Sequence, residues 1–144
     1  MFAYLDDPKC LAAHMGKSAM MMMGSHMSID VDAHSGRVIG SKIHMQGSMM
    51  GIPLSLDEVI TGRQAPYKKS WQTIGTPQLH VMAHYRLGFD VIPKGNSSLV
   101  RVYIDYNLPA TAFSSLLGWL LGGVYARWCT KRMADDAIKH FKRS

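Results

Sequence analysis

The period of the hydrophobic pattern changes near residue 27, which divides the chain into segments of different secondary structure. Before that point apolar residues recur with helical spacing, at Phe2, Leu5, Leu11, Ala12 and Met15. Asp6-Asp7-Pro8 interrupts the spacing, and an aspartate before a proline is suited to cap a new helix. The pattern predicts two short helices between Phe2 and Met23.

From residue 27 onward apolar and polar side chains alternate, as in strands with one dry face. Met27, Ile29 and Val31 mark the first strand, and Ser35-Gly36 predicts a hairpin turn after it. Turn residues separate five further segments of the same kind: Val38 to Gly51, Leu54 to Thr61, Lys69 to Thr76, Leu79 to Ile92 and Ser98 to Leu108. Within Val38 to Gly51, Ile39 is expected to share the face of Ile43, Met45 and Met49. The result is a six-stranded antiparallel meander.

The last segment is helical, because apolar residues recur every three or four positions from Phe113 to Phe141. A helix of this length needs a large apolar surface to cover, and a sheet with one dry face provides it. The predicted fold class is α+β, with a curved antiparallel sheet wrapped around a long C-terminal helix. No repeat or linker divides the chain, so one domain over residues 1–144 is expected.

Composition narrows the class of protein. Hydrophobic residues make up 47% and charged residues 18% of the 144 positions, which is typical of a folded globular chain. The longest apolar stretch, Phe113 to Ala126, contains serines and glycines and is shorter than the ~20 residues of a membrane-spanning helix. The first ten residues lack the basic and apolar regions of a signal peptide. A cytoplasmic protein is therefore expected.

The formal charge of +6 is concentrated at the C-terminal end, where the last 18 residues carry six basic and two acidic side chains. Cations suit the C-terminus of a helix because they complement its dipole, and this interpretation is favoured. The alternative is peripheral docking of this basic end on an anionic membrane or a partner surface. No nucleic-acid partner is expected.

Four local strings support a family resemblance: Phe2 to Pro8 (FAYLDDP), Leu11 to Met15 (LAAHM), His84 to Phe89 (HYRLGF) and Asp105 to Pro109 (DYNLP). With the order of helix pair, meander and long helix, they resemble bacterial members of the START-like helix-grip superfamily, also called SRPBCC. That superfamily includes polyketide cyclases, the birch pollen allergen type and coenzyme Q-binding proteins. The resemblance implies a cavity between sheet and helix for a hydrophobic small molecule such as a lipid, quinone, polyketide or aromatic compound.

The chain departs from the family at its start. Family members usually begin with a strand before the FAYLDDP-type helix, whereas this sequence opens at Met1-Phe2. An absent first strand leaves an unpaired sheet edge, which invites pairing with another chain. The expectation is either a start codon further upstream or a dimer through that edge; otherwise the protein is a monomer.

Candidate ligand contacts are the apolar residues expected between sheet and helix: Ile43, Met45, Met49, Trp71, Ile104, Leu117, Leu121 and Trp128. Most residues of this kind form only a core. Tyr85 and Tyr106 lie on otherwise apolar stripes, where a buried hydroxyl needs a hydrogen-bonding partner. The partner is either a ligand carbonyl or, as is more usual, backbone or water.

Glu58 is the candidate for a catalytic residue. It alternates in step with Leu54, Leu56 and Ile60, and if that face is inward, burial raises the pKa of Glu58 into the range of a general acid or base. In the other register Asp57 faces inward instead, and the sequence leaves both open. The leading function is therefore a carrier or sensor of a hydrophobic molecule, with a cyclase or dehydrase-like enzyme as the alternative.

Metal and cofactor sites have no support in the sequence. His80 and His84 are four residues apart on a predicted strand, about 13 Å, which is too far for one metal ion. Motifs for hydrolase, nucleotide or dinucleotide chemistry are absent from the sequence. Arg86 and Asp105 either pair across strands, which is favoured, or hold a ligand carboxylate.

Overall fold

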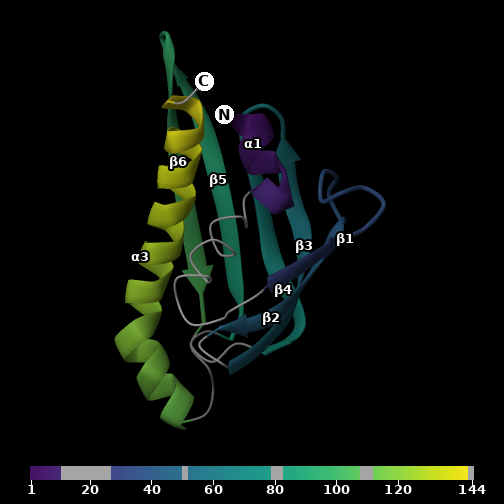
Figure 1. Ribbon diagram of the computed structural model, residues 1–144, viewed down its shortest axis with the longest axis vertical. Helices are drawn as coiled ribbons and strands as arrows, with labels where there is room; N and C mark the ends of the chain where they lie inside the picture. The colour runs from purple at the N-terminus through teal and green to yellow at the C-terminus, as the bar shows by residue number, and fades with distance from the viewer. Residues whose placement is uncertain (11–26, 50–51, 79–82, 108–111, 143–144) are drawn as a thin grey trace.

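A curved six-stranded sheet and one long helix dominate the structure, a computed structural model that describes residues 1–10, 27–49, 52–78, 83–107 and 112–142 (Figure 1). The elements in chain order are α1 (Phe2–Asp6), β1 (Met27–Val31), β2 (Lys42–Met49), β3 (Ile52–Gln64), β4 (Lys68–Gln78), β5 (Tyr85–Lys94), β6 (Ser97–Tyr106) and α3 (Ala112–Lys142). The strands pair antiparallel in the order β1-β2-β3-β4-β5-β6. This confirms the predicted meander and long C-terminal helix.

The connection between β1 and β2 is longer than the hairpin turn predicted from Ser35-Gly36. Both residues have positive φ, 53° and 68°, and the turn is held by hydrogen bonds from the backbone N–H groups of Ser35 and Arg37. Ser41 stabilises it further, because its hydroxyl bonds both Asp32 (2.6 Å) and the N–H of Gly36 (3.0 Å). The expected strand at Val38 therefore begins only at Lys42, and the prediction that Ile39 faces the core is wrong: Ile39 is 65% exposed.

Strand β5 also lies further along the chain than its turn residues indicated. It runs from Tyr85 to Lys94, whereas the prediction ended it at Ile92; residues 79–82 lie outside the described part of the chain. Its pairing with β4 ends at Lys68↔Asp90, so Pro93 lies on a stretch of β5 that has no β4 partner. Because Pro93 has no partner on β4, its missing N–H removes no hydrogen bond between β4 and β5. The strand therefore continues to the turn at Gly95.

The core lies on the concave face of the sheet, where the period of two places alternate side chains. Its buried members are Phe2, Leu5, Ile43, Met45, Leu54, Leu56, Ile60, Trp71, Leu87, Phe89, Val91, Met133 and Ala137. Helix α1 packs at the same end of the molecule as the C-terminal end of α3, and the rings of Tyr4 and His140 stack with centroids 4.4 Å apart (Figure 1). Sheet, α1 and the C-terminal half of α3 therefore close one end of the core.

An ionic cluster fixes α1 to the sheet. Arg63 donates two hydrogen bonds to the carboxylate of Asp6 (3.0 and 2.7 Å), and the Lys69 ammonium lies 3.0 Å from the same carboxylate and 2.6 Å from the Asp6 carbonyl oxygen. Burial by itself raises the pKa of Asp6, but the hydrogen bonds from Arg63 and Lys69 outweigh it and lower that pKa. Asp6 is therefore ionised and paired although it is only 4% exposed.

The predicted aspartate cap is present. The Asp7 carboxylate accepts hydrogen bonds from the backbone N–H groups of Lys9 (2.9 Å) and Cys10 (3.4 Å) at the start of a helical segment, residues 8–10. The remainder of the second predicted helix, as far as Met23, falls in residues 11–26, outside the described residues.

Candidate functional site

Glu58 points into the core, which settles the register that the sequence left open. On β3 it lies opposite Ile43 of β2 and Thr73 of β4, and it is only 2% exposed. Asp57 faces outward, where its carboxylate is 2.7 Å from Nδ1 of His44. The inward face of β3 is thus a row of Leu54, Leu56, Glu58 and Ile60, in which the glutamate is the one ionisable group.

Two polar side chains, one on β4 and one on β5, contact the Glu58 carboxyl group. The Tyr85 hydroxyl donates a hydrogen bond to its Oε1 atom, and Trp71 contributes a second side-chain hydrogen bond. Burial raises the pKa of Glu58 to about 7, although both hydrogen bonds and the charge of Lys69 act in the opposite direction. Near neutral pH this carboxyl group is therefore close to half protonated, and it can give or take a proton.

Tyr85 is positioned where β4 and β5 separate. The two strands pair only as far as Gln72↔Arg86. At the next position the Thr73 hydroxyl oxygen accepts the backbone N–H of Tyr85 (3.1 Å) and lies 3.1 Å from Nδ1 of His84. A threonine side chain therefore takes the place of the next ladder bond, and it fixes the backbone that carries the Tyr85 phenol.

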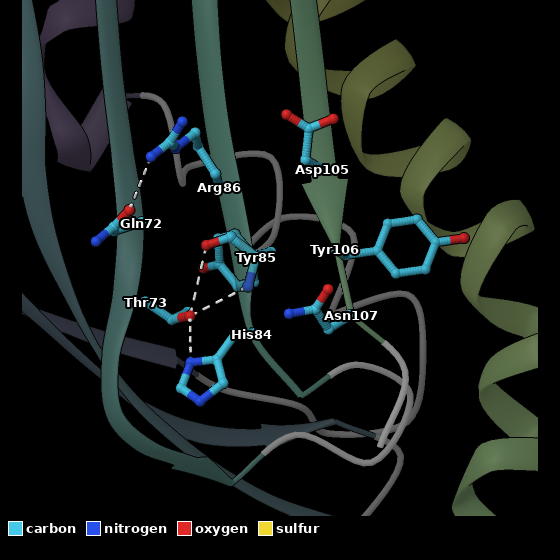
Figure 2. Close-up of a pocket in the computed structure, with 8 residues that line it drawn as sticks. All are labelled: Gln72, Thr73, His84, Tyr85, Arg86, Asp105, Tyr106 and Asn107. Atoms are coloured by element: carbon cyan, nitrogen blue, oxygen red, sulfur yellow. Dashed lines mark hydrogen bonds between the residues drawn. The ribbon is translucent and has the colours of Figure 1, made fainter. Parts of the chain in front are cut away.

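A hollow of about 440 Å³ lies at this separation (Figure 2). Its lining comes from the neighbouring ends of β4, β5 and β6: Gln72, Thr73, His84, Tyr85, Arg86, Asp105, Tyr106 and Asn107. The lining is mainly polar, unlike the concave face beside it. Tyr85 belongs to both regions, because it lines the hollow and its phenol reaches the buried Glu58.

The structure brings together only some of the residues proposed from the sequence. Ile43, Met45 and Trp71 are buried in the core, while Ile104 and Tyr85 are half-buried against it. These residues share the concave face with Glu58. All five belong to the buried core cluster or pack against it, and packing accounts for their burial.

The remaining residues proposed from the sequence as ligand contacts lie on β2, β6 and α3. Tyr85 and Tyr106 are register partners on β5 and β6. The Tyr106 hydroxyl approaches α3 at Gly123, where an added Cβ would lie 3.6 Å from it. Trp128 is half-buried on α3, with the Arg132 guanidinium 5.8 Å from its ring centre. The side chains of Met49, Leu117 and Leu121 lie outside the described part of the structure.

Arg86 and Asp105 face each other across β5 and β6 but form no ion pair among the described residues. Arg86 instead donates a hydrogen bond to Gln72 (3.4 Å), its register partner on the other side. The favoured charge pair is therefore not formed. Both charged groups remain exposed beside the hollow.

Sequence reasoning missed Thr73, Gln72 and Asn107. A signal existed for Thr73, because it alternates in step with Trp71 and so had to face the same side as that tryptophan. The sequence carries no comparable signal for the hollow, since it depends on where β4 and β5 part.

Neither a metal-binding cluster nor a membrane-spanning helix is present in the described part of the chain. Among residues 1–10, 27–49, 52–78, 83–107 and 112–142, no three His, Cys, Asp or Glu side chains gather closely enough to hold a metal ion. Within the same residues, no helix has the length and apolar character needed to cross a membrane.

Comparison with known proteins identifies the fold. No family model and no curated protein matches the sequence. The structure is similar to the crystal structure of Ara h 8.0201, with a TM-score of 0.52 and 11% sequence identity over 91% of this chain and 87% of that chain. Identity at this level establishes the fold alone, which is a helix-grip fold in which a curved antiparallel sheet wraps around a long C-terminal helix.

Proposed function

We propose that this protein binds a hydrophobic small molecule between the concave face of the sheet and α3, as a carrier or sensor. The observation that carries the proposal is the Glu58–Tyr85 pair, in which a buried carboxyl group flanked on its face of β3 by Leu56 and Ile60 accepts a hydrogen bond from a phenol. A buried carboxyl group contributes less to stability than an apolar side chain of similar size. A glutamate here is understandable if its hydrogen-bonding capacity serves a ligand.

The pair indicates which ligands fit best. An apolar ring or chain would gain ~25 cal/mol for each Å² removed from water against the concave face. One ligand oxygen, a carbonyl or hydroxyl, would then bond the carboxyl or phenol group of the pair. Lipids, quinones, polyketides and aromatic compounds with a single oxygen function satisfy this description. The resemblance to polyketide cyclases and coenzyme Q-binding proteins points to the same classes.

A fluorescent probe tests the proposal directly. N-phenyl-1-naphthylamine should bind saturably, and a quinone or a long-chain alcohol should displace it. Tyr85→Trp should abolish binding by filling the space beside Glu58. Tyr67→Trp is the matched control, because Tyr67 lies in the turn before β4 and is 48% exposed. Absence of saturable binding, or equal binding by the two variants, would refute the carrier function.

A second candidate is supported by the pKa of Glu58, which is raised to about 7. A carboxyl group that is half protonated near neutral pH suits general acid–base catalysis, as in a cyclisation or dehydration of a polyketide-like carbonyl compound. Tyr85 would polarise the carbonyl oxygen. If this is correct, Glu58→Gln abolishes product formation while the folded structure and probe binding persist; unchanged turnover in that variant would eliminate the enzyme.

A further inference from the structure

The polar hollow at the ends of β4, β5 and β6 is not accounted for by binding on the concave face. Alternation on a sheet explains a row of exposed polar side chains, and Gln72, Arg86 and Asp105 form such a row across three paired strands. It does not explain a depression of about 440 Å³ among them. That volume falls within the range of about 300–1,000 Å³ that is typical of small-molecule sites.

The depression exists because two pairings end at different places. β4 continues to Gln78 beside β3, whereas the start of β5, before Arg86, has no β4 partner and pairs only with β6, as far as Tyr85↔Tyr106. Beyond that pair, backbone hydrogen bonds between His84 and Asn107 (2.8 Å) and between Ala83 and Asn107 (2.9 Å) keep the ends of β5 and β6 together. The walls of the hollow are therefore held by main-chain bonds on one side and by Thr73 on the other.

The lining offers donors and acceptors in nearly equal measure. Arg86 supplies guanidinium N–H groups, of which one bonds Gln72, and Asp105 supplies a carboxylate that is not ion-paired with it. The amides of Gln72 and Asn107 each add a donor and an acceptor. In Figure 2, Asn107 points from the end of β6 toward β5, and Arg86 and Asp105 stand on neighbouring strands above it.

We propose that this hollow binds an uncharged, hydroxyl-rich group, such as the sugar part of a glycoside. A hydroxyl group donates to a carboxylate and accepts from a guanidinium at the same time, so adjacent hydroxyls satisfy Arg86 and Asp105 together. A carboxylate ligand would satisfy Arg86 and repel Asp105, and an ammonium ligand would do the reverse. The formal charges of the pair cancel, so neither sign of ligand is favoured.

This inference rests in part on the proposed function, because Tyr85 connects the two regions. Its backbone is bound by Thr73 at the edge of the hollow, and its phenol bonds the buried Glu58. Gln72, Arg86 and Asp105 lie on the outward face of the sheet, so a ligand with its apolar part against the concave face would reach them through the opening between β4 and β5 that begins beyond Gln72↔Arg86. The predicted ligand class is thus an amphipathic molecule whose hydroxyl-rich end occupies the hollow.

Four probes that share an eight-carbon chain and differ only in their head group test the inference: octyl glucoside, octanol, octanoate and octylamine. The binding of each is measured by displacement of the fluorescent naphthylamine. Octyl glucoside should bind about tenfold more tightly than octanol, the equivalent of one or two net hydrogen bonds. Asp105→Ala should reduce that preference about fivefold and leave octanol binding unchanged. Arg101→Ala is the control, an exposed cation on the same strand that does not line the hollow.

The outcomes separate the two proposals. Octanol binding with no preference for the glucoside, or a preference for octanoate or octylamine, would overturn the sugar site and leave the carrier function standing. Methyl glucoside, which has no chain, should shift the amide resonances of His84 and Asn107 in NMR spectra. Such shifts without binding of any octyl probe or the dye would support the hollow and refute the carrier. If methyl glucoside causes no such shifts and neither the dye nor any octyl probe binds, the sugar site and the carrier function are both refuted.

Discussion

The burial of Glu58 makes a quantitative prediction about stability and pH. Its pKa is about 7 in the folded protein and 4.5 as the unperturbed value, so the folded state holds the proton more tightly than the unfolded chain. This contribution is fully present below pH 4.5 and is lost as the pH rises through about 7. At about 1.4 kcal/mol for each pH unit of difference, the total loss is about 3 kcal/mol.

The variant Glu58→Gln isolates this effect, because glutamine keeps the shape and an acceptor oxygen but cannot ionise. Urea unfolding of both proteins should be followed by tryptophan fluorescence between pH 5 and pH 8. The free energy of unfolding of the wild type should fall by about 2–3 kcal/mol more than that of Glu58→Gln over this range. Other groups, such as His44 beside Asp57, titrate in both proteins and cancel in the difference.

Parallel curves for the two proteins would refute the reasoning, because they would mean that Glu58 ionises as easily in the folded protein as in the unfolded chain. A carboxyl titration by carbon-13 NMR gives an independent check. The Glu58 signal should have its midpoint near 7, and a midpoint near 4.5 would show that solvent or an unrecognised cation reaches this carboxyl group.

Two further substitutions test the packing around the site. Lys69→Met should lower the free energy of unfolding by about 2–3 kcal/mol. The loss is smaller than for a fully broken buried ion pair because Arg63 still binds Asp6. Lys68→Met, on the exposed side of the same strand, is the control and should change the free energy of unfolding by under about 0.5 kcal/mol. Gly88→Ala should cost about 1–3 kcal/mol, because the new methyl group would collide with the Tyr103 ring that covers Gly88. In a Tyr103→Ala background thermal melting should show most of that cost removed; the same loss in both backgrounds would exclude the collision.

The hydrophobic pattern predicted the fold because burial on one face imposes a period of two on every strand and 3.6 on the helix. The helix predicted from Phe113 to Phe141 is α3, Ala112–Lys142. The pattern failed where local turn chemistry decides the geometry. Residues 32–41 form a long turn tied by Ser41 and Asp32, and no periodic signal marks where such a turn ends.

The candidate site was only half predictable for a related reason. Periodicity limited Glu58 to two registers, and the β2–β3 pairing in the folded sheet selected one of them. The partners of Glu58 come from β4 and β5, and the partners of Asp6 are 57 residues away on β3 and 63 residues away on β4. Contacts between distant segments leave no local pattern, so neither the Asp6 cluster nor the hollow was visible in the sequence.

Asp6 on α1 and Glu58 on β3, the two buried acids in the described part of the chain, show how environment assigns a role to a residue type. Asp6 is contacted by two cations, and its pKa is lowered, so its charge is used to hold α1. Glu58 is equally buried but is met by a phenol and an indole, and its pKa is raised to about 7. A permanently ionised group suits a fixed structural contact. A carboxyl group that changes protonation near neutral pH, at the junction of an apolar face and a polar hollow, is suited to exchange partners with a ligand, and that contrast is the reason for placing function at Glu58 rather than at Asp6.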